Sequence, residues 1–285
     1  MSRAANLRTP AAFALLALLA LPLAAQQHPN KEHGFAPEKA YHLGEIDSVN
    51  AFNGGLIVTL PIGPSLPLAA DLSFGLTLVY NSNLWEWRIP VSPGIGYAEP
   101  NPTFNAGIGW RLSLGELVPA HHPSNHTQFV AYVGPDGAHH PFADQVGAFQ
   151  SPNGPSTPLP AAGSTVVTYT LDGSFLRLTW TPGASPPYRL EHPDGTVDSF
   201  DVLGRLVRRE NRSGVGLSLA HTEDGWVATD AHGRQVEVIY DHRVGVTLGK
   251  VVAEVKVPQF DGTQASYAFE YEDRELPRGC PNDDG

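Results

Sequence analysis

The chain has 285 residues, a formal net charge of −11, and only 16% charged residues. This acidity argues against nucleic acid or an anionic membrane face as a partner, because both are bound by clustered Lys and Arg. The 29 Gly, the 26 Pro and the lack of a sustained 3.6-residue apolar period after residue 45 predict an all-β fold of antiparallel hairpins.

The N-terminus predicts export. Residues 1–25 are typical of a signal peptide, because Arg3 and Arg8 precede an unbroken apolar run over residues 11–21 and small residues follow it. The run is shorter than the about 20 residues of a membrane span, and an uncleaved anchor is the alternative. We expect a secreted, cell-surface or periplasmic protein with no membrane span after signal removal, which begins with a flexible segment over residues 26–44.

Residues 45–146 are predicted to form a sandwich-like N-terminal β region. Apolar residues alternate with polar or small ones over residues 72–80, which is the pattern of a strand with one buried face. Pro61 is expected to end the preceding strand or to place it at an edge, since proline donates no ladder hydrogen bond. A turn is expected at residues 64–67. The predicted strands are 55–61, 72–80 and 109–118, followed by a hairpin around the Asp-Gly pair at residue 136.

A long connection over residues 81–102 carries Trp85, Trp87 and Tyr97. Aromatic side chains in a loop can form a stacking platform for a sugar or a peptide. The alternative is that these aromatics anchor the loop on the core, as a loop of this length requires. Trp85, Trp87 and Tyr97 are the candidate ligand-binding residues.

Histidines gather in the following stretch. His121, His122, His139 and His140 could bind zinc or another divalent ion together with a nearby carboxylate. Adjacent residues on a strand point to opposite faces, so neighbouring histidines do not converge there. The alternative is that they are polar surface residues of loops. The sequence therefore predicts no metal and no cofactor, and these four histidines are the candidate ligands if a metal binds.

Residues 147–163 are rich in Pro, Ser and Gly and are expected to form an exposed loop, after which residues 164–275 repeat a hairpin pattern. Asp-Gly between half-apolar runs predicts a type I′ turn, which needs positive φ at both central residues. Because a single hairpin is marginal in water, we predict hairpins laid edge to edge in one quasi-repeat sheet. The Asp-Gly pairs begin at residues 136, 172, 194, 224 and 261, and Asp-x-x-Gly-Arg turns cover residues 201–205 and 230–234.

Several short motifs follow one another in order: Asn53-Gly54-Gly55, Tyr80-Asn81, Gly109-Trp110-Arg111, Pro193-Asp194-Gly195-Thr196, Phe200-Asp201, Gly204-Arg205-Leu206, Gly233-Arg234 and Tyr240-Asp241. On these motifs the chain resembles the N-terminal segment of a secreted bacterial RHS/YD-repeat protein over residues 45–275. The resemblance implies long β-sheets that wrap into a hollow shell, often around a C-terminal toxin domain released by self-cleavage. Other members of that family act in contact between cells and bind carbohydrate.

The sequence contains no Gly-x-Ser-x-Gly elbow and no Gly-rich phosphate loop before a predicted helix. With the resemblance, this predicts an exported, non-enzymatic structural or adhesive protein, the opening segment of an RHS-repeat shell. Its expected partner is a cell-surface carbohydrate or a C-terminal toxin domain absent from this chain. The alternatives are a carbohydrate-binding module that uses the loop over residues 85–97, and a secreted hydrolase.

Cys280 lies in an end segment, residues 276–285, which is expected to be unstructured. Its thiol either forms a disulfide with a partner beyond that end or is free.

Overall fold

The computed structural model describes residues 40–42, 46–50, 54–88, 97–101, 103–118, 130–143, 163–243 and 249–273, all of which belong to one compact unit, residues 33–285. Within these ranges the secondary structure consists of strands without helices, and every strand pairing is antiparallel, which confirms the predicted all-β fold. Among the same residues, no helix has the length and apolarity to cross a membrane. The expected signal peptide, most of the Pro-rich loop and Cys280 lie outside the described residues.

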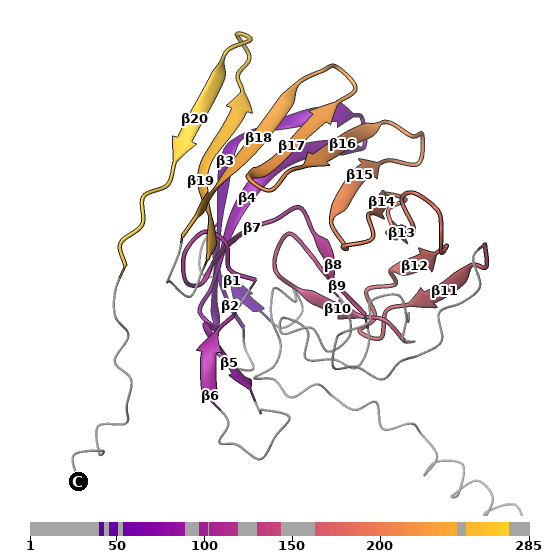
Figure 1. The fold of residues 1–285 in the computed structure, drawn as a ribbon, viewed down its shortest axis with the longest axis horizontal. Coiled ribbons are helices and arrows are strands. Elements are labelled where there is room, and N and C mark those ends of the chain that lie inside the picture. The colour runs from indigo at the N-terminus through magenta and orange to yellow at the C-terminus, as the bar shows by residue number, and fades with distance from the viewer. Residues whose placement is uncertain are drawn as a thin grey trace, which may run out of the picture. The chain divides into compact units, whose positions relative to one another are not determined.

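A single antiparallel sheet of ten strands lies within residues 164–275, where the sequence predicts hairpins laid edge to edge (Figure 1). Each strand pairs with its neighbours in sequence, so the sheet is a continuous meander. Its strands are β11 (Val166–Tyr169), β12 (Arg177–Trp180), β13 (Tyr188–Glu191), β14 (Val197–Phe200), β15 (Leu206–Glu210), β16 (Gly216–His221), β17 (Gly225–Asp230), β18 (Gln235–His242), β19 (Lys250–Pro258) and β20 (Gln264–Ala268).

The N-terminal strands form three smaller sheets. A five-stranded sheet has the order β1 (Ala40–His42), β2 (Asp47–Asn50), β3 (Leu56–Ala69), β4 (Leu72–Asn81) and β7 (Trp110–Leu112). A three-stranded sheet contains β8 (Glu116–Val118), β9 (Ala131–Val133) and β10 (His139–Pro141). The last is a two-stranded sheet of β5 (Trp85–Arg88) and β6 (Tyr97–Pro100).

The same five-residue loop joins six pairs of strands, at residues 134–138, 192–196, 201–205, 211–215, 230–234 and 259–263. In each loop the N–H of the fourth residue donates to the carbonyl of the first, and the N–H of the first donates to the carbonyl of the fifth. The fourth residue is always a glycine, with φ between 76° and 89°. This geometry is a type I turn followed by a left-handed residue. The predicted type I′ turn is therefore wrong for the three of these loops that contain Asp-Gly, 134–138, 192–196 and 259–263, because only the glycine has positive φ.

The Asp-Gly and Asp-x-x-Gly-Arg motifs are two ways of stabilising this one loop. In the first, Asp194 is the third residue, and its Oδ1 accepts the N–H of Thr196 at 2.8 Å. In the second, Asp201 is the first residue, and its Oδ1 accepts the N–H groups of Leu203 and Arg205, each at 2.9 Å. A short carboxylate side chain can thus satisfy loop N–H groups from either position.

Pro61 lies within β3, where β3 pairs with β4 alone among the described residues, so its predicted edge position is confirmed. Four details of the N-terminal region differ from the sequence prediction. The turn expected at residues 64–67 is instead an irregularity within the β3–β4 ladder, between Ile62 and Leu66. The expected strand over residues 109–118 is divided into β7 and β8, which belong to different sheets, and the expected connection over residues 81–102 contains β5 and β6. Residues 40–42, in the segment expected to be flexible, form β1.

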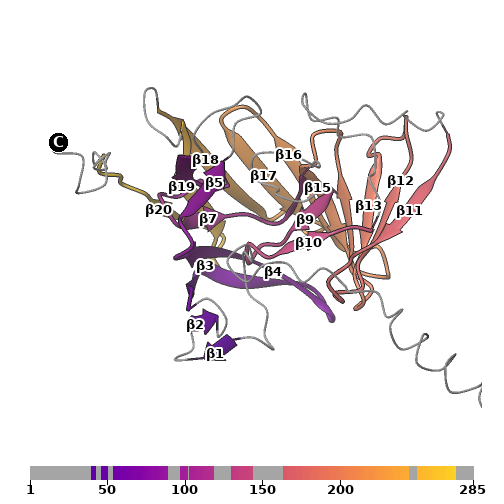
Figure 2. The ribbon, with the colours of Figure 1, turned by 90° about the horizontal axis from the view of Figure 1, so that it is seen from below.

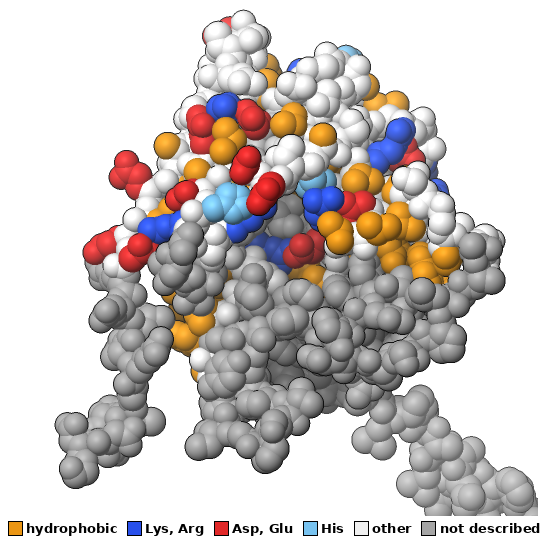
Figure 3. Space-filling model, in the orientation of Figure 1, with side chains coloured by type: hydrophobic (Ala, Val, Ile, Leu, Met, Phe, Trp, Pro, Cys, Tyr) orange, Lys and Arg blue, Asp and Glu red, His pale blue; other side chains and the backbone are white. Residues whose placement is uncertain are grey.

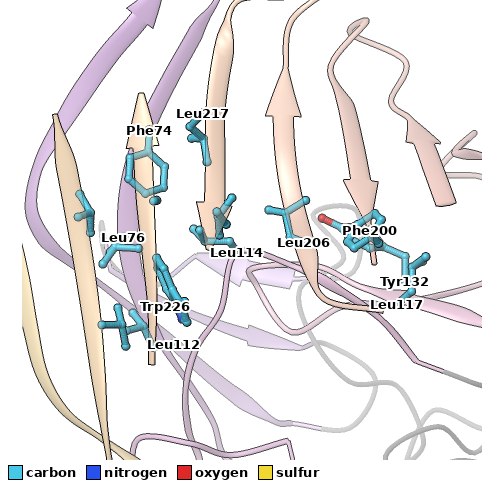
Figure 4. Packing of buried hydrophobic residues seen from close by; sticks show 14 of the residues in the cluster. Phe74, Leu76, Leu112, Leu114, Leu117, Tyr132, Phe200, Leu206, Leu217 and Trp226 are labelled. Atoms are coloured by element: carbon cyan, nitrogen blue, oxygen red, sulfur yellow. The ribbon is translucent and has the colours of Figure 1, made fainter. Parts of the chain in front are cut away.

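The five-stranded and three-stranded sheets share one hydrophobic core with the ten-stranded sheet. Phe74 and Leu76 from β4 and Leu112 from β7 pack in the same cluster as Trp226 from β17 (Figure 4). Figure 2 shows β7 to β10 on the concave side of the ten-stranded sheet, with the β3–β4 hairpin beside them. The second layer of the N-terminal sandwich is therefore the ten-stranded sheet.

Candidate functional site

A pocket of about 330 Å³ opens where the segment over residues 103–116 faces the ends of β15 to β19. A hollow is visible near the centre of the face in Figure 3, with cationic, acidic and His side chains around it. This volume is at the lower end of the range for small-molecule sites. The polar and aromatic residues that line the pocket are Thr103, Asn105, Arg111, Ser113, Glu116, Arg205, His221, Thr222, Trp226, Tyr240 and Lys250.

The wall of the pocket is held in place by side-chain hydrogen bonds to the backbone. Asn105 accepts the N–H of Leu112 on Oδ1 and donates from Nδ2 to the Leu112 carbonyl, both at 2.8 Å. Asn105 therefore acts as a strand partner for β7. Its own carbonyl accepts the N–H of Val252 on β19 at 2.6 Å, which attaches this wall to the ten-stranded sheet.

The interior of the pocket contains a satisfied ion pair and a buried phenol. The guanidinium of Arg111, a buried residue, donates to Glu116 Oε1 at 2.7 Å. Burial raises the pKa of the Tyr240 hydroxyl, although hydrogen bonds with the side chains of Trp226 and Asn105 act in the opposite direction. These groups make the interior polar without leaving an uncompensated charge there.

The mouth of the pocket carries Arg205, His221 and Lys250. Arg205 is ion-paired with Asp201 at 2.7 Å. The ammonium of Lys250 lies 4.3 Å from the centroid of the Tyr240 ring, a cation–π geometry, and partial desolvation lowers its pKa. Among the described residues, Lys250 makes no ion pair, although the charges of Asp224 and Glu223 act to raise its pKa against the effect of desolvation. Lys250 is therefore the cation of this pocket that is open to a ligand.

His221 offers a neutral imidazole at the same mouth. Its Nε2 lies 2.6 Å from the Leu206 carbonyl oxygen, which can only accept, so Nε2 carries the proton. Burial lowers the pKa of His221, which favours the neutral ring. In that tautomer Nδ1 has a free lone pair and can accept a hydrogen bond from a bound molecule.

A second polar cluster is centred on a fully buried carboxylate and joins the two regions. Asp198 on β14 has no exposed surface and accepts two hydrogen bonds from Arg209 on β15, at 2.7 and 2.6 Å. Burial alone would raise the pKa of Asp198, but the charge and hydrogen bonds of Arg209, together with the hydrogen bond of His192, lower it. Arg209 also donates to the Leu114 carbonyl at 3.0 Å. Because the polar groups of this cluster have hydrogen-bond partners within the protein, we interpret the cluster as a structural joint, a contact that stabilises the packing of the N-terminal region on the ten-stranded sheet.

The outer edge of β20 is the third notable feature. Among the described residues, β20 pairs only with β19. The N–H of Phe269, just beyond β20, donates to Ala253 of β19, so by alternation the N–H groups of Ala268 and Ser266 point away from the sheet. An unpaired edge of this kind is a template for another strand.

The predicted ligand-binding aromatics lie together in one small hairpin. Trp85 and Trp87 are on β5, and Tyr97 is on β6, where it pairs with Arg88. Trp85 is 46% exposed. The structure therefore places these residues on adjacent strands, in a two-stranded sheet separate from the pocket.

The predicted metal candidates divide into two sets. His121 and His122 lie outside the described residues, whereas His139 and His140 are adjacent on β10. Nδ1 of His140 lies 2.6 Å from Asp172 Oδ2. Within the described ranges, no group of three or more His, Cys, Asp or Glu side chains could hold a metal ion.

Sequence reasoning missed the pocket. Arg111, His221 and Lys250 come from three separate parts of the chain and form no motif with a fixed spacing. The one local signal is Tyr240-Asp241, which was noticed as a repeat motif. Its tyrosine turns out to line the pocket beneath Lys250.

Comparisons with known proteins identify no family for this chain. No protein-family model matches the chain, and no curated protein matches it. The chain is similar to the crystal structure of TcdB2-TccC3-TEV, with 16% identity and a TM-score of 0.32, over 92% of this chain and 12% of that one. It thus spans a small part of that protein's length. Similarity at this TM-score is weak and carries no argument about function.

Proposed function

We propose that this chain is a non-enzymatic wall segment, the opening part of an RHS/YD-type β-shell that grows by adding strands at β20. The observation that carries this proposal is the meander of ten strands, which pairs strictly in sequence order and ends at an edge with outward N–H groups. A sheet built this way can be lengthened by further hairpins without rearranging the existing ones.

The turn chemistry supports the same proposal. Loops with Asp in the first or third position and Gly in the fourth recur along the sheet with identical backbone bonds. The loops also carry the motifs on which the chain resembles the RHS/YD-repeat family. In that family a shell encloses a toxin domain or makes cell-surface contact, and we propose one of these roles for the exported form of this chain.

The test is whether β20 accepts another strand. At rising concentration, the purified chain is expected to associate in sedimentation velocity experiments, since a second copy can supply the missing partner. Ala268→Pro removes an outward N–H without removing a bond to β19, and it is expected to keep the protein monomeric. Ala268→Val keeps that N–H and is the matched control.

Two results would contradict the proposal. If the parent chain and Ala268→Pro show the same monomeric behaviour at every concentration, strand addition at β20 fails. Turnover on panels of glycosides or esters would overturn the non-enzymatic assignment. Far-UV circular dichroism of both variants verifies that a change in association does not reflect unfolding.

The exposure of Trp85 on a surface hairpin favours a second candidate, a carbohydrate-binding module. In that case, replacing Trp85 and Trp87 together with Ala should abolish retention on polysaccharide columns while the far-UV spectrum stays unchanged. Retention that survives the double substitution eliminates this candidate.

A further inference from the structure

The pocket beside Lys250 combines one open cation with one neutral acceptor. Arg111 and Arg205 also face the pocket, but each already has a carboxylate partner at 2.7 Å. Lys250 has none among the described residues, and its ammonium lies over the Tyr240 ring. The negative charges of Asp224 and Glu223 nevertheless act on Lys250, and Glu116 lines the same pocket. A ligand with one negative charge is therefore favoured over a dianion, because these carboxylates would repel a second charge.

The acceptor narrows the class of ligand further. Nε2 of His221 is occupied by the Leu206 carbonyl, so Nδ1 is the ring atom that can accept a hydrogen bond. Thr222 also lines the pocket, and its hydroxyl already donates to the Gly225 carbonyl at 3.3 Å. A ligand that matches both Lys250 and Nδ1 of His221 carries a carboxylate for the ammonium and at least one hydroxyl for the imidazole.

We propose that this pocket binds a small hydroxy-carboxylate of the sugar-acid type, whose carboxylate pairs with Lys250 and whose hydroxyl donates to Nδ1 of His221. The volume of about 330 Å³ accommodates one such unit. The buried floor formed by Leu112, Leu206 and Trp226 excludes water from one side of the ligand and strengthens the ion pair at the mouth. This site is independent of β20, so its failure leaves the proposed wall function standing.

The test uses glucuronate as the probe and isothermal titration calorimetry on the full chain. Glucose lacks the carboxylate, acetate lacks the hydroxyls, and inorganic phosphate carries more charge, so all three are expected to bind more weakly. Lys250→Met is expected to weaken glucuronate about tenfold to a hundredfold, the effect of losing a charge-assisted hydrogen bond. Lys256→Met removes the same charge from β19 outside the pocket and is expected to leave affinity unchanged.

His221→Gln tests the hydroxyl contact separately. The Gln amide can still donate to the Leu206 carbonyl, but its oxygen does not occupy the position of Nδ1, so the preference for glucuronate over acetate should fall. An unchanged preference overturns the role of His221. No binding of glucuronate at millimolar concentration, equal binding of phosphate, or full affinity in a folded Lys250→Met variant overturns the proposed site.

Discussion

Each strand of the ten-stranded sheet pairs with its neighbour in sequence, whereas the N-terminal strands are distributed over three sheets and β7 pairs with β4 across the β5–β6 hairpin. The first region is built from local hairpins, and five of its nine connections are the same recurring loop. The second depends on contacts between distant segments. Local turn chemistry can therefore specify much of a meander, whereas the layer packed against it needs partners from elsewhere in the chain.

The two regions meet at a small number of polar contacts. Arg209 donates to the Leu114 carbonyl, the N–H of Leu117 donates to the Gly204 carbonyl, and Asn211 donates to Asp71. Each of these three meander residues has a counterpart on the same sheet that does not itself bind the N-terminal region. Arg208 is the counterpart of Arg209, and Gly233 is the counterpart of Gly204. Asp201 and Asp230 are the counterparts of Asn211. Matched substitutions can therefore separate the cost of losing a junction from the cost of disturbing the meander.

Arg209 is expected to show the largest effect. Arg209→Met leaves the fully buried Asp198 without its guanidinium partner, and breaking a buried pair in this way costs about 3–5 kcal/mol of unfolding free energy. Arg208→Met on the same strand removes an exposed pair with Glu210 and should cost less than about 1 kcal/mol. Urea denaturation measures both, and equal losses would contradict the role of Arg209 as a joint.

Gly204 and Gly233 occupy the same position of the same loop, with φ of 78° and 76°. A Cβ at Gly204 would lie 2.1 Å from the Leu117 carbonyl oxygen, whereas a Cβ at Gly233 meets nothing within 4 Å. Gly233→Ala should cost about 1–2 kcal/mol for the left-handed backbone alone. Gly204→Ala adds the collision with β8 and should cost about 2–5 kcal/mol. Equal destabilisation in thermal unfolding would show that β8 does not press on this loop.

Asn211 takes the first loop position that Asp201 and Asp230 fill in two of the other copies. The repeat pattern alone predicts that Asn211→Asp is harmless, because an Asp can accept the same N–H groups of Ser213 and Val215. The hydrogen bond from Asn211 to Asp71 predicts instead that Asn211→Asp lowers the free energy of unfolding by about 1–2 kcal/mol. The donor to Asp71 disappears, and two carboxylates face each other. Adding Asp71→Asn should restore stability, and a double variant as unstable as the single one would refute the contact.

The pair of His140 and Asp172 should give the smallest effect. Burial acts to raise the pKa of Asp172, but the hydrogen bond from His140 and those from Ser174 outweigh it and lower the pKa to about 2. A carboxyl group with a depressed folded pKa stabilises above its unfolded pKa near 4, and that contribution is lost as pH falls toward 2. Asp172→Asn should therefore lose at most about 1 kcal/mol at neutral pH, and the difference from the parent should vanish at acid pH. A difference that is independent of pH would assign the stabilisation to another cause.

The loops show how far the sequence could be interpreted. Gly195, Gly204 and Gly233 mark the turns correctly because a left-handed position favours glycine whatever surrounds it. The turn type was wrong because the same dipeptide suits several turns, and the hydrogen bonds of the Asp side chain decide among them. The loop at residues 211–215 escaped notice since Asn211 replaces Asp and Val215 replaces Arg.

The two candidate binding sites differ in how far the sequence could predict them. The aromatic hairpin could be predicted as a group because Trp85 and Trp87 are neighbours in the chain. The pocket could not, because Arg111, His221 and Lys250 come from separate elements that only folding brings together. No periodicity or spacing links such residues.

The sequence alone predicted the β-class of this protein, the hairpin pattern over residues 164–275 and, apart from Gly214, the glycines of the recurring loop. These features follow from alternation and turn chemistry, which act over a few residues. Only the tertiary structure decided that residues 109–118 divide between two sheets, that the five-stranded and three-stranded sheets share a core with the meander, and that a pocket forms beside Lys250. The physical reason is that burial of apolar surface and pairing of buried charges depend on which distant segments meet.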